Sequence, residues 1–186
     1  HVFANAQTGN IVLLSQHIFA GNWADVMRYL MPVLSFMFGV AAATEIRQHF
    51  QNIGRIHWRQ IVILIEMSML FLVGFLPGKM DLVANAFVSF SCAMQVQTFR
   101  KVDSYAFAST MCIGNIRSGM EALCAYRQSH NRQILYKAFH YFGIIILFAF
   151  GAGIGSILIP VFNLQTIWFS SFLLMVGFFL MFIQEK

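Results

Sequence analysis

Apolar residues gather into long runs along this chain, and most charged residues fall in the short stretches between the runs. A helix needs about 20 apolar residues to cross the hydrocarbon core of a bilayer. Runs that approach or exceed this length cover residues 29–46, 60–77, 82–99, 138–160 and 164–184. The pattern therefore predicts an all-α integral membrane protein. We expect its outer surface to contact the lipid bilayer.

Two further segments, 2–20 and 104–125, are apolar at their ends but polar in the middle. The first contains a Gln-Thr-Gly-Asn run, and the second contains a Gly-Asn pair followed by Arg117. A central Arg in a lipid-facing helix costs about 2.5–3.5 kcal/mol on insertion scales. Irregular backbone survives at membrane depth only where protein or water surrounds it. We therefore expect each segment to be a broken or re-entrant helix.

The distribution of charge supports this interpretation. The chain has a formal net charge of +5, and most basic residues lie in three connections, near 47–59, 100–101 and 127–137. Such loops are typical of the cytoplasmic side of a membrane protein. If all three are cytoplasmic, segment 104–125 enters and leaves from the same side. The basic residues form no stripe along one face, so no nucleic-acid partner is expected.

Composition excludes several other classes of protein. Hydrophobic residues make up 59% of the chain and charged residues 10%, whereas soluble domains carry about 25% charged residues. The three cysteines lie in apolar segments and predict no disulfide framework. The six histidines are scattered without metal-ligand spacing. We expect no metal, no cofactor and no enzymatic activity.

Short motifs recur in the same order in the two halves of the chain. Gly9-Asn10-Ile11 matches Gly114-Asn115-Ile116, and the run from Phe36 to Gly39 matches the run from Phe148 to Gly151. These matches indicate a duplication with repeats at 1–78 and 79–186. With three full spans in each half, the halves would be oppositely oriented, as in many secondary transporters. By this symmetry, we expect the first span of a six-span bundle to precede His1.

Residues 2–14 read VFANAQTGNIVLL, which resembles the signature of the YoaK-type family of bacterial six-span inner-membrane proteins. Residues 93–97 resemble that family's Gly-Met-Gln-Asn segment, with Ala93 in place of Gly and Gln97 one position beyond the expected Asn. The second-half motif lacks its usual Thr, because Ile113 precedes Gly114. The resemblance implies a multi-pass protein of the bacterial inner (cytoplasmic) membrane, with no established substrate.

A Gly-Asn break in an apolar segment predicts a new helix start. Asn is a favoured N-cap, and helices beginning at Asn10 and Asn115 would direct free amides and positive dipole ends toward the membrane interior. Such ends bind anions, and Arg117 would add positive charge. We therefore predict a transporter for a small polar solute, anionic or carboxylate-bearing. Its expected central site consists of Gln7, Thr8, Gly9, Asn10, Gly114, Asn115 and Arg117.

Several alternatives stay open at this point. Arg117 and Glu121 have the spacing of an ion pair that would neutralise both charges. Glu66 lies in mid-span, where it is either a proton-coupling group or a protonated side chain that hydrogen-bonds inside the bundle. Gln95 and Gln97 lie near a span end and suit interfacial hydrogen bonds as well as ligand contact. The protein could also be a channel for water or small solutes, or a membrane scaffold without transport, and the sequence permits homo-oligomers without requiring them.

Overall fold

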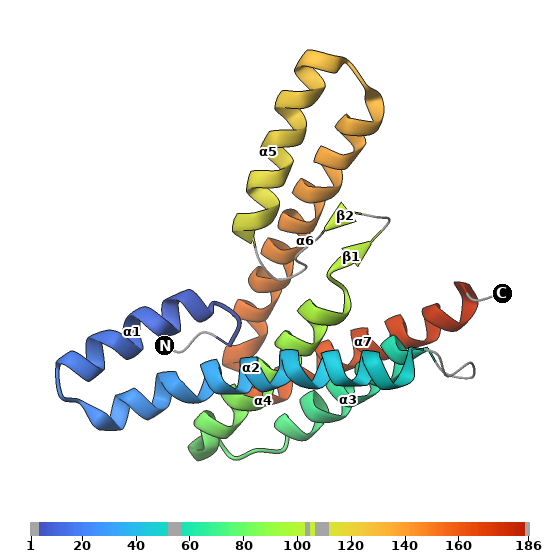
Figure 1. Cartoon of the computed structure of the whole chain (residues 1–186). Coiled ribbons are helices and arrows are strands. Elements are labelled where there is room, and N and C mark those ends of the chain that lie inside the picture. The colour runs from blue at the N-terminus through green and yellow to red at the C-terminus, as the bar shows by residue number, and fades with distance from the viewer. Residues whose placement is uncertain (1–3, 52–56, 103–104, 107–111, 185–186) are drawn as a thin grey trace. The chain divides into compact units, whose positions relative to one another are not determined.

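In the computed structural model the chain is almost wholly helical (Figure 1). The structure describes residues 4–51, 57–102, 105–106 and 112–184. They form two compact units. The first comprises the described residues of 1–98 and 162–186, and the second comprises those of 99–161.

The first unit is a bundle of five α-helices and two 3₁₀ turns. They are α1 (Gln7–Phe19), α2 (Trp23–Phe50), α3 (Trp58–Val73), η1 (Gly78–Met80), α4 (Asp81–Thr98), η2 (Asn163–Thr166) and α7 (Ile167–Gln184). Helix α2 packs against α1 and α4, and α3 packs against α4 and α7. Helix α4 therefore has neighbours on opposite sides, and this position is what places polar side chains in the interior.

The second unit contains α5 (Cys112–Ser129) and α6 (Arg132–Phe162), whose last residue belongs to the first unit. Two-residue strands, β1 (Lys101–Val102) and β2 (Tyr105–Ala106), pair in antiparallel fashion. Helix α5 runs back along α6 (Figure 1), and the two are in close contact at Gly119. A Cβ atom at Gly119 would lie 3.1 Å from the ring of Phe142.

All five apolar runs expected to be spans are helical, as predicted. Residues 23–50 and 132–181 form stretches that are long and apolar enough to cross a membrane. The helix expected over 60–77 ends earlier, at Val73. It is followed by Gly74 and then by Pro77, and a proline just beyond a helix is a common stop signal. The chain is thus all-α, with the composition expected of a helical membrane protein.

The helix starts predicted at Asn10 and Asn115 are wrong. Helix α1 begins at Gln7, and the amides of Gly9 and Asn10 already donate to the carbonyl oxygen of Ala6, at 3.0 and 3.3 Å. Helix α5 likewise runs through Gly114 and Asn115. One glycine in a helix costs only about 1 kcal/mol relative to alanine, so a Gly-Asn pair need not stop a helix. Both asparagines are the fourth residue of their helix, not its cap.

Other parts of the two polar segments lie outside the described residues. These parts are Val2 and Phe3 of the family signature, and residues 104 and 107–111, which precede α5 in the sequence. The re-entrant course of segments 2–20 and 104–125 therefore stays a prediction. The repeats at 1–78 and 79–186 do too, because the two compact units are defined by packing rather than by internal similarity.

The contact between α2 and α4 is the tightest part of the described core. A Cβ atom at Gly39 would lie 2.5 Å from the carbonyl oxygen of Phe90 and 2.7 Å from the Cβ of Ala93. Only glycine allows the helix backbones to approach this closely. One turn further on, Ala43 is buried against Trp58, Val62 and Met94. Gly39 and Ala43 therefore act as packing residues in the first unit.

Candidate functional site

A buried polar network joins the start of α1 to α2 and α4. The Asn10 amide donates to Gln7 Oε1 at 3.0 Å, and Gln7 Nε2 donates to Ser89 Oγ at 2.9 Å. Ser89 Oγ lies 2.7 Å from the carbonyl oxygen of Ala4 and 2.9 Å from that of Pro32, and its single proton can serve either one. Asn10 and Ser89 are both 0% exposed. The network therefore ties three segments together through hydrogen bonds shielded from solvent.

Only two of the predicted site residues of α1 enter this network. Gln7 and Asn10 belong to it, whereas Thr8 is exposed and Gly9 is half-buried outside it. Gln7 uses its carbonyl oxygen and its amide nitrogen at once, since Nε2 also donates to the Ala4 carbonyl oxygen at 3.0 Å. Buried polar groups that find their partners within the protein stabilise a single arrangement. The hydrogen bond from Asn10 to Gln7 therefore favours a structural role for Asn10 over contact with a solute.

The predicted site residues of the second unit lie on α5. Asn115 is buried, with 2% exposure, whereas Gly114 is exposed and has open space around it. Arg117 is also exposed, and its Nε donates to Glu121 Oε1 at 2.8 Å. The neutralising ion pair that the sequence allowed is therefore present, and the guanidinium charge is already matched by a carboxylate. These residues and those of α1 belong to different compact units.

A cavity of about 410 Å³ lies between α3, α4 and α7 of the first unit. Polar side chains from all three helices border it, and aliphatic side chains complete its wall. The lining residues are Glu66, Leu70, Val88, Ser91, Cys92, Gln95, Ile167, Ser170, Leu173 and Leu174. We call this space the Glu66 cavity.

Two side chains of the Glu66 cavity hold polar atoms without partners. Glu66 and Ser91 are only 1% and 3% exposed, and neither Glu66 Oε1 nor Ser91 Oγ has a hydrogen-bond partner among the described residues. A buried polar atom without a partner costs about 1–3 kcal/mol, and a charged one costs more. Such groups are rare in folded proteins unless something else meets them. The cavity therefore offers unused hydrogen-bonding capacity.

The sequence of α4 explains why one helix serves both polar clusters. Successive residues of an α-helix are about 100° apart, so Ser89 and Ser91 point about 200° apart, to opposite faces. Ser91 and Gln95 are four residues apart and share the face toward the cavity. Gln97 donates instead to Thr44 Oγ1 of α2, at 3.1 Å, so the two glutamines have different surroundings.

Ser89 and Ser91 were not predicted from the sequence as residues of a functional site. Serine is common at helix contacts in membrane proteins, so a Ser-Phe-Ser triplet in an apolar run carries little signal by itself. The two-residue spacing was the informative signal. It places the two hydroxyls on opposite faces of the helix, so both faces must be covered by other parts of the protein. Glu66, by contrast, was found because an ionisable residue in mid-span stands out.

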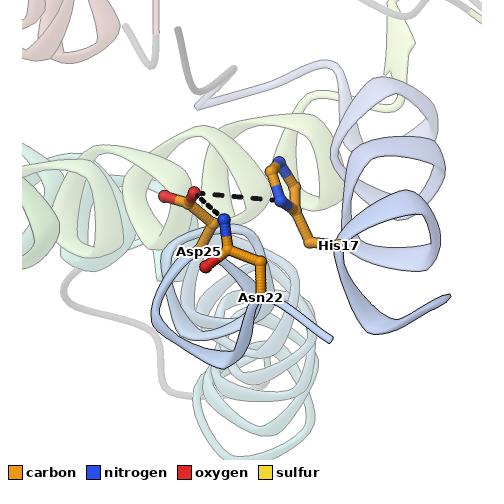
Figure 2. Close-up of polar contacts among 3 residues, drawn as sticks. All are labelled: His17, Asn22 and Asp25. Atoms are coloured by element: carbon orange, nitrogen blue, oxygen red, sulfur yellow. Dashed lines mark hydrogen bonds and ion pairs between the residues drawn. The ribbon is translucent and has the colours of Figure 1, made fainter. Parts of the chain in front are cut away.

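A third polar cluster closes the turn between α1 and α2. Asn22 Nδ2 donates to Asp25 Oδ2 at 2.8 Å, and His17 Nδ1 lies 3.8 Å from the same oxygen. Figure 2 shows the three side chains converging. The His17 ring also stacks on Tyr29, with centroids 5.3 Å apart. Gly21 has a φ of +70° and makes the reversal possible without strain. The turn thus holds α1 against α2 and keeps Gln7 beside Ser89.

Comparison with family models decides the relationship of this chain to other proteins. Residues 1–180 match the model of a family described as protein of unknown function (DUF1275). The chain belongs to the DUF1275 family. This confirms the resemblance seen in the sequence, and the description assigns no activity to the family's members. No curated protein and no solved structure gives a match.

Proposed function

We propose that this DUF1275 protein is a transport protein of the bacterial inner membrane, which it crosses several times, and that its solute is small and polar. The observation that carries the proposal is the Glu66 cavity. It holds one carboxyl oxygen, Glu66 Oε1, and one hydroxyl group, that of Ser91, without hydrogen-bond partners among the described residues, and it lies between three helices. Ionisable side chains inside membrane bundles are rare, and they commonly mark the path of a solute or a proton.

The position of the cavity supports an inverted repeat. Under the proposed duplication, α3 and α7 are the last spans of the two halves and are therefore equivalent helices. They pack against each other, as two equivalent helices beside a two-fold axis would. Inverted-repeat transporters bind their solutes near the bilayer midplane, at the interface between the repeats. Glu66 is the ninth of the sixteen residues of α3, which supports a position close to that midplane if α3 crosses the membrane as proposed.

Helix lengths support the re-entrant part of the proposal. The thirteen residues of α1 span about 20 Å at 1.5 Å per residue, which is short of a hydrocarbon core about 30 Å thick. Helix α5 has eighteen residues, but its polar and charged side chains make it unsuited to face lipid. We propose that both helices enter the membrane region only in part.

Glu66 is proposed to couple transport to protons. A carboxylate buried without a partner is costly, so it must be neutralised by a proton or by a cationic group. The two cannot be held at the same oxygen atoms at the same time. Such competition is the physical requirement for exchanging a solute for a proton.

The charges of the described residues favour a polar solute over the anionic one that the sequence suggested. Arg117 is engaged by Glu121 at 2.8 Å, and the described lining of the cavity contains no Lys, Arg or His. An anion would therefore meet the Glu66 carboxyl with no compensating positive charge. We propose no catalytic role for any of these residues.

One observation favours a second candidate, a membrane scaffold without transport. The network of Gln7, Asn10 and Ser89 holds three segments together without any ligand. If the whole polar interior served that purpose, Glu66 would be a structural residue like the others. A transport measurement in which Glu66 alone is changed separates the two candidates.

The proposal is tested with purified protein in liposomes that contain a pH-sensitive dye. Small polar solutes are added outside, and solute-dependent proton movement is recorded for the wild type, Glu66→Gln and Glu45→Gln. Glu45 is the matched control, because its side chain is exposed on α2 beside His49. We expect at least one solute to move protons in the wild type and in Glu45→Gln but not in Glu66→Gln. No signal for any solute would favour the scaffold, whereas equal signals in all three proteins would refute the coupling role of Glu66.

A further inference from the structure

The wall of the Glu66 cavity divides into a polar part and an aliphatic part. Glu66, Ser91, Gln95 and Ser170 supply a carboxyl group, two hydroxyl groups and a side-chain amide. The aliphatic side chains come from all three helices and are Leu70, Val88, Ile167, Leu173 and Leu174. A ligand that fits this wall has a polar head and a short hydrocarbon body.

The polar part of the wall favours a cationic head. Glu66 is the one residue with a formal charge among the described residues that line the cavity, and that charge is negative. The carboxyl, the hydroxyls and the amide oxygen all accept hydrogen bonds, and a carboxylate donates none. An ammonium group offers three donors and a positive charge, so it can satisfy the unpartnered oxygens of Glu66 and Ser91 together.

The size and the apolar share of the cavity favour an organic cation over a metal ion. Ligand pockets commonly measure about 300–1,000 Å³, and about 410 Å³ lies at the lower end of that range. Calcium takes six to eight oxygen ligands, and magnesium requires near-ideal octahedral geometry. One carboxyl, two hydroxyls and one amide oxygen among five aliphatic side chains supply at most five protein oxygens, one carboxylate being the only charged ligand, and this does not provide such a shell.

We infer that the Glu66 cavity binds a small aliphatic ammonium ion. Its head contacts the carboxyl of Glu66, with Ser91 and Gln95 as further acceptors, and its hydrocarbon body lies against the leucines of α3 and α7. This inference rests on the proposed function in using the same cavity, and it names the chemical class of the solute.

Three matched probes test the head group in isolation. n-Butylammonium, butan-1-ol and butyrate share one hydrocarbon body and differ in charge, and their binding to the full chain in detergent is measured by isothermal titration calorimetry. We expect n-butylammonium to bind, butan-1-ol to bind at least about tenfold more weakly because it lacks the charge, and butyrate not to bind. Preferred binding of butyrate, or equal binding of n-butylammonium and butan-1-ol, would overturn the inference.

Variants assign the binding to the cavity. Glu66→Gln keeps the shape of the side chain and should weaken n-butylammonium binding about tenfold to a hundredfold, since a charge-assisted contact is lost. Glu45→Gln should bind like the wild type. Unchanged affinity in Glu66→Gln would place the site elsewhere and contradict the inference.

A second measurement does not depend on the folding of Glu66→Gln. Cys92 lines the cavity, whereas Cys112 and Cys124 lie on α5. In a Cys112→Ser, Cys124→Ser background, n-butylammonium should slow maleimide labelling of Cys92, and butyrate should not. Labelling that n-butylammonium leaves unchanged would count against the inference.

Binding and transport are measured separately, so failure of the proposed ligand class can be distinguished from failure of the proposed transport function. If n-butylammonium binds through Glu66 but no solute moves protons in liposomes, the inference stands and transport is refuted. If a solute moves protons in a Glu66-dependent manner while butyrate is the preferred probe, transport stands and the cationic class is refuted.

Discussion

Helix α4 has a polar cluster on each of two opposite faces, and the clusters differ in whether their polar atoms have partners. Toward α1 and α2, Ser89 lies in a network in which Gln7 uses both its amide nitrogen and its carbonyl oxygen. Toward α3 and α7, Ser91 and Glu66 keep atoms without partners among the described residues, beside a cavity. Satisfied buried groups stabilise a fold, whereas unsatisfied ones destabilise it and are retained where a ligand uses them.

The largest effect is expected where α2 and α4 meet, because their spacing sets the position of α4 and so of both clusters. In Gly39→Ala the new Cβ would lie 2.5 Å from the Phe90 carbonyl oxygen, a backbone atom that cannot move aside alone. We expect the free energy of unfolding in mixed detergent to fall by about 2–3 kcal/mol. Gly151→Ala is the matched control, because a Cβ there meets nothing within 4 Å. Replacing that helical glycine should raise stability by up to about 1 kcal/mol, and equal responses would show that the close approach is not specific to Gly39.

The second-largest effect is expected in the network of Gln7, Asn10 and Ser89, where a substitution should lower the stability of the protein and leave ligand binding unchanged. Ser89→Ala leaves the Gln7 amide without its hydroxyl acceptor and removes the hydrogen bond to the Pro32 or Ala4 carbonyl oxygen. We expect a loss of about 1–3 kcal/mol in the free energy of unfolding, with unchanged affinity for n-butylammonium. A loss of affinity without a loss of stability would assign the network a role in binding and end the contrast between the two faces of α4.

A substitution in the Glu66 cavity should have the opposite effect, with ligand binding lost and stability retained. Glu66→Leu removes a buried carboxyl whose Oε1 has no described partner, and it places an apolar side chain beside Leu70 and Val88. Replacing an unsatisfied buried polar group by an apolar one is neutral or stabilising. We therefore expect the free energy of unfolding to stay level or to rise by about 1 kcal/mol, while n-butylammonium binding is lost. A destabilised protein would mean that Glu66 serves the fold.

The sequence predicts the helices better than it predicts the interactions between them. Apolar runs locate α2, α3, α4, α6 and α7, because hydrophobic length is a property of each segment alone. The helix starts at Asn10 and Asn115 could not be predicted from capping preference. That preference is worth about 1 kcal/mol, and the surroundings of a side chain can outweigh it, as the bond from Asn10 to Gln7 illustrates.

The candidate site was predictable only in part for a related reason. Glu66 is conspicuous in the sequence, but its neighbours Ser91 and Ser170 become neighbours only when α4 and α7 pack on α3. Arg117 was assigned to the site because its charge is conspicuous too, yet its partner lies one turn away on the same helix. Local spacing predicted that pair correctly, whereas the cavity depends on contacts between distant parts of the chain.

The smallest effect is expected on α5, where a charged pair lies on the surface. Arg117→Ala removes a side chain that is 80% exposed and leaves Glu121, which is 62% exposed, free to be solvated. Exposed ion pairs contribute little to stability, so we expect no measurable change in melting temperature and no change in solute-dependent proton movement. Arg117→Lys is the control that retains the charge. Transport that is lost in Arg117→Ala and restored in Arg117→Lys would return the positive charge to the solute path, and with it the anionic solute that the sequence first suggested.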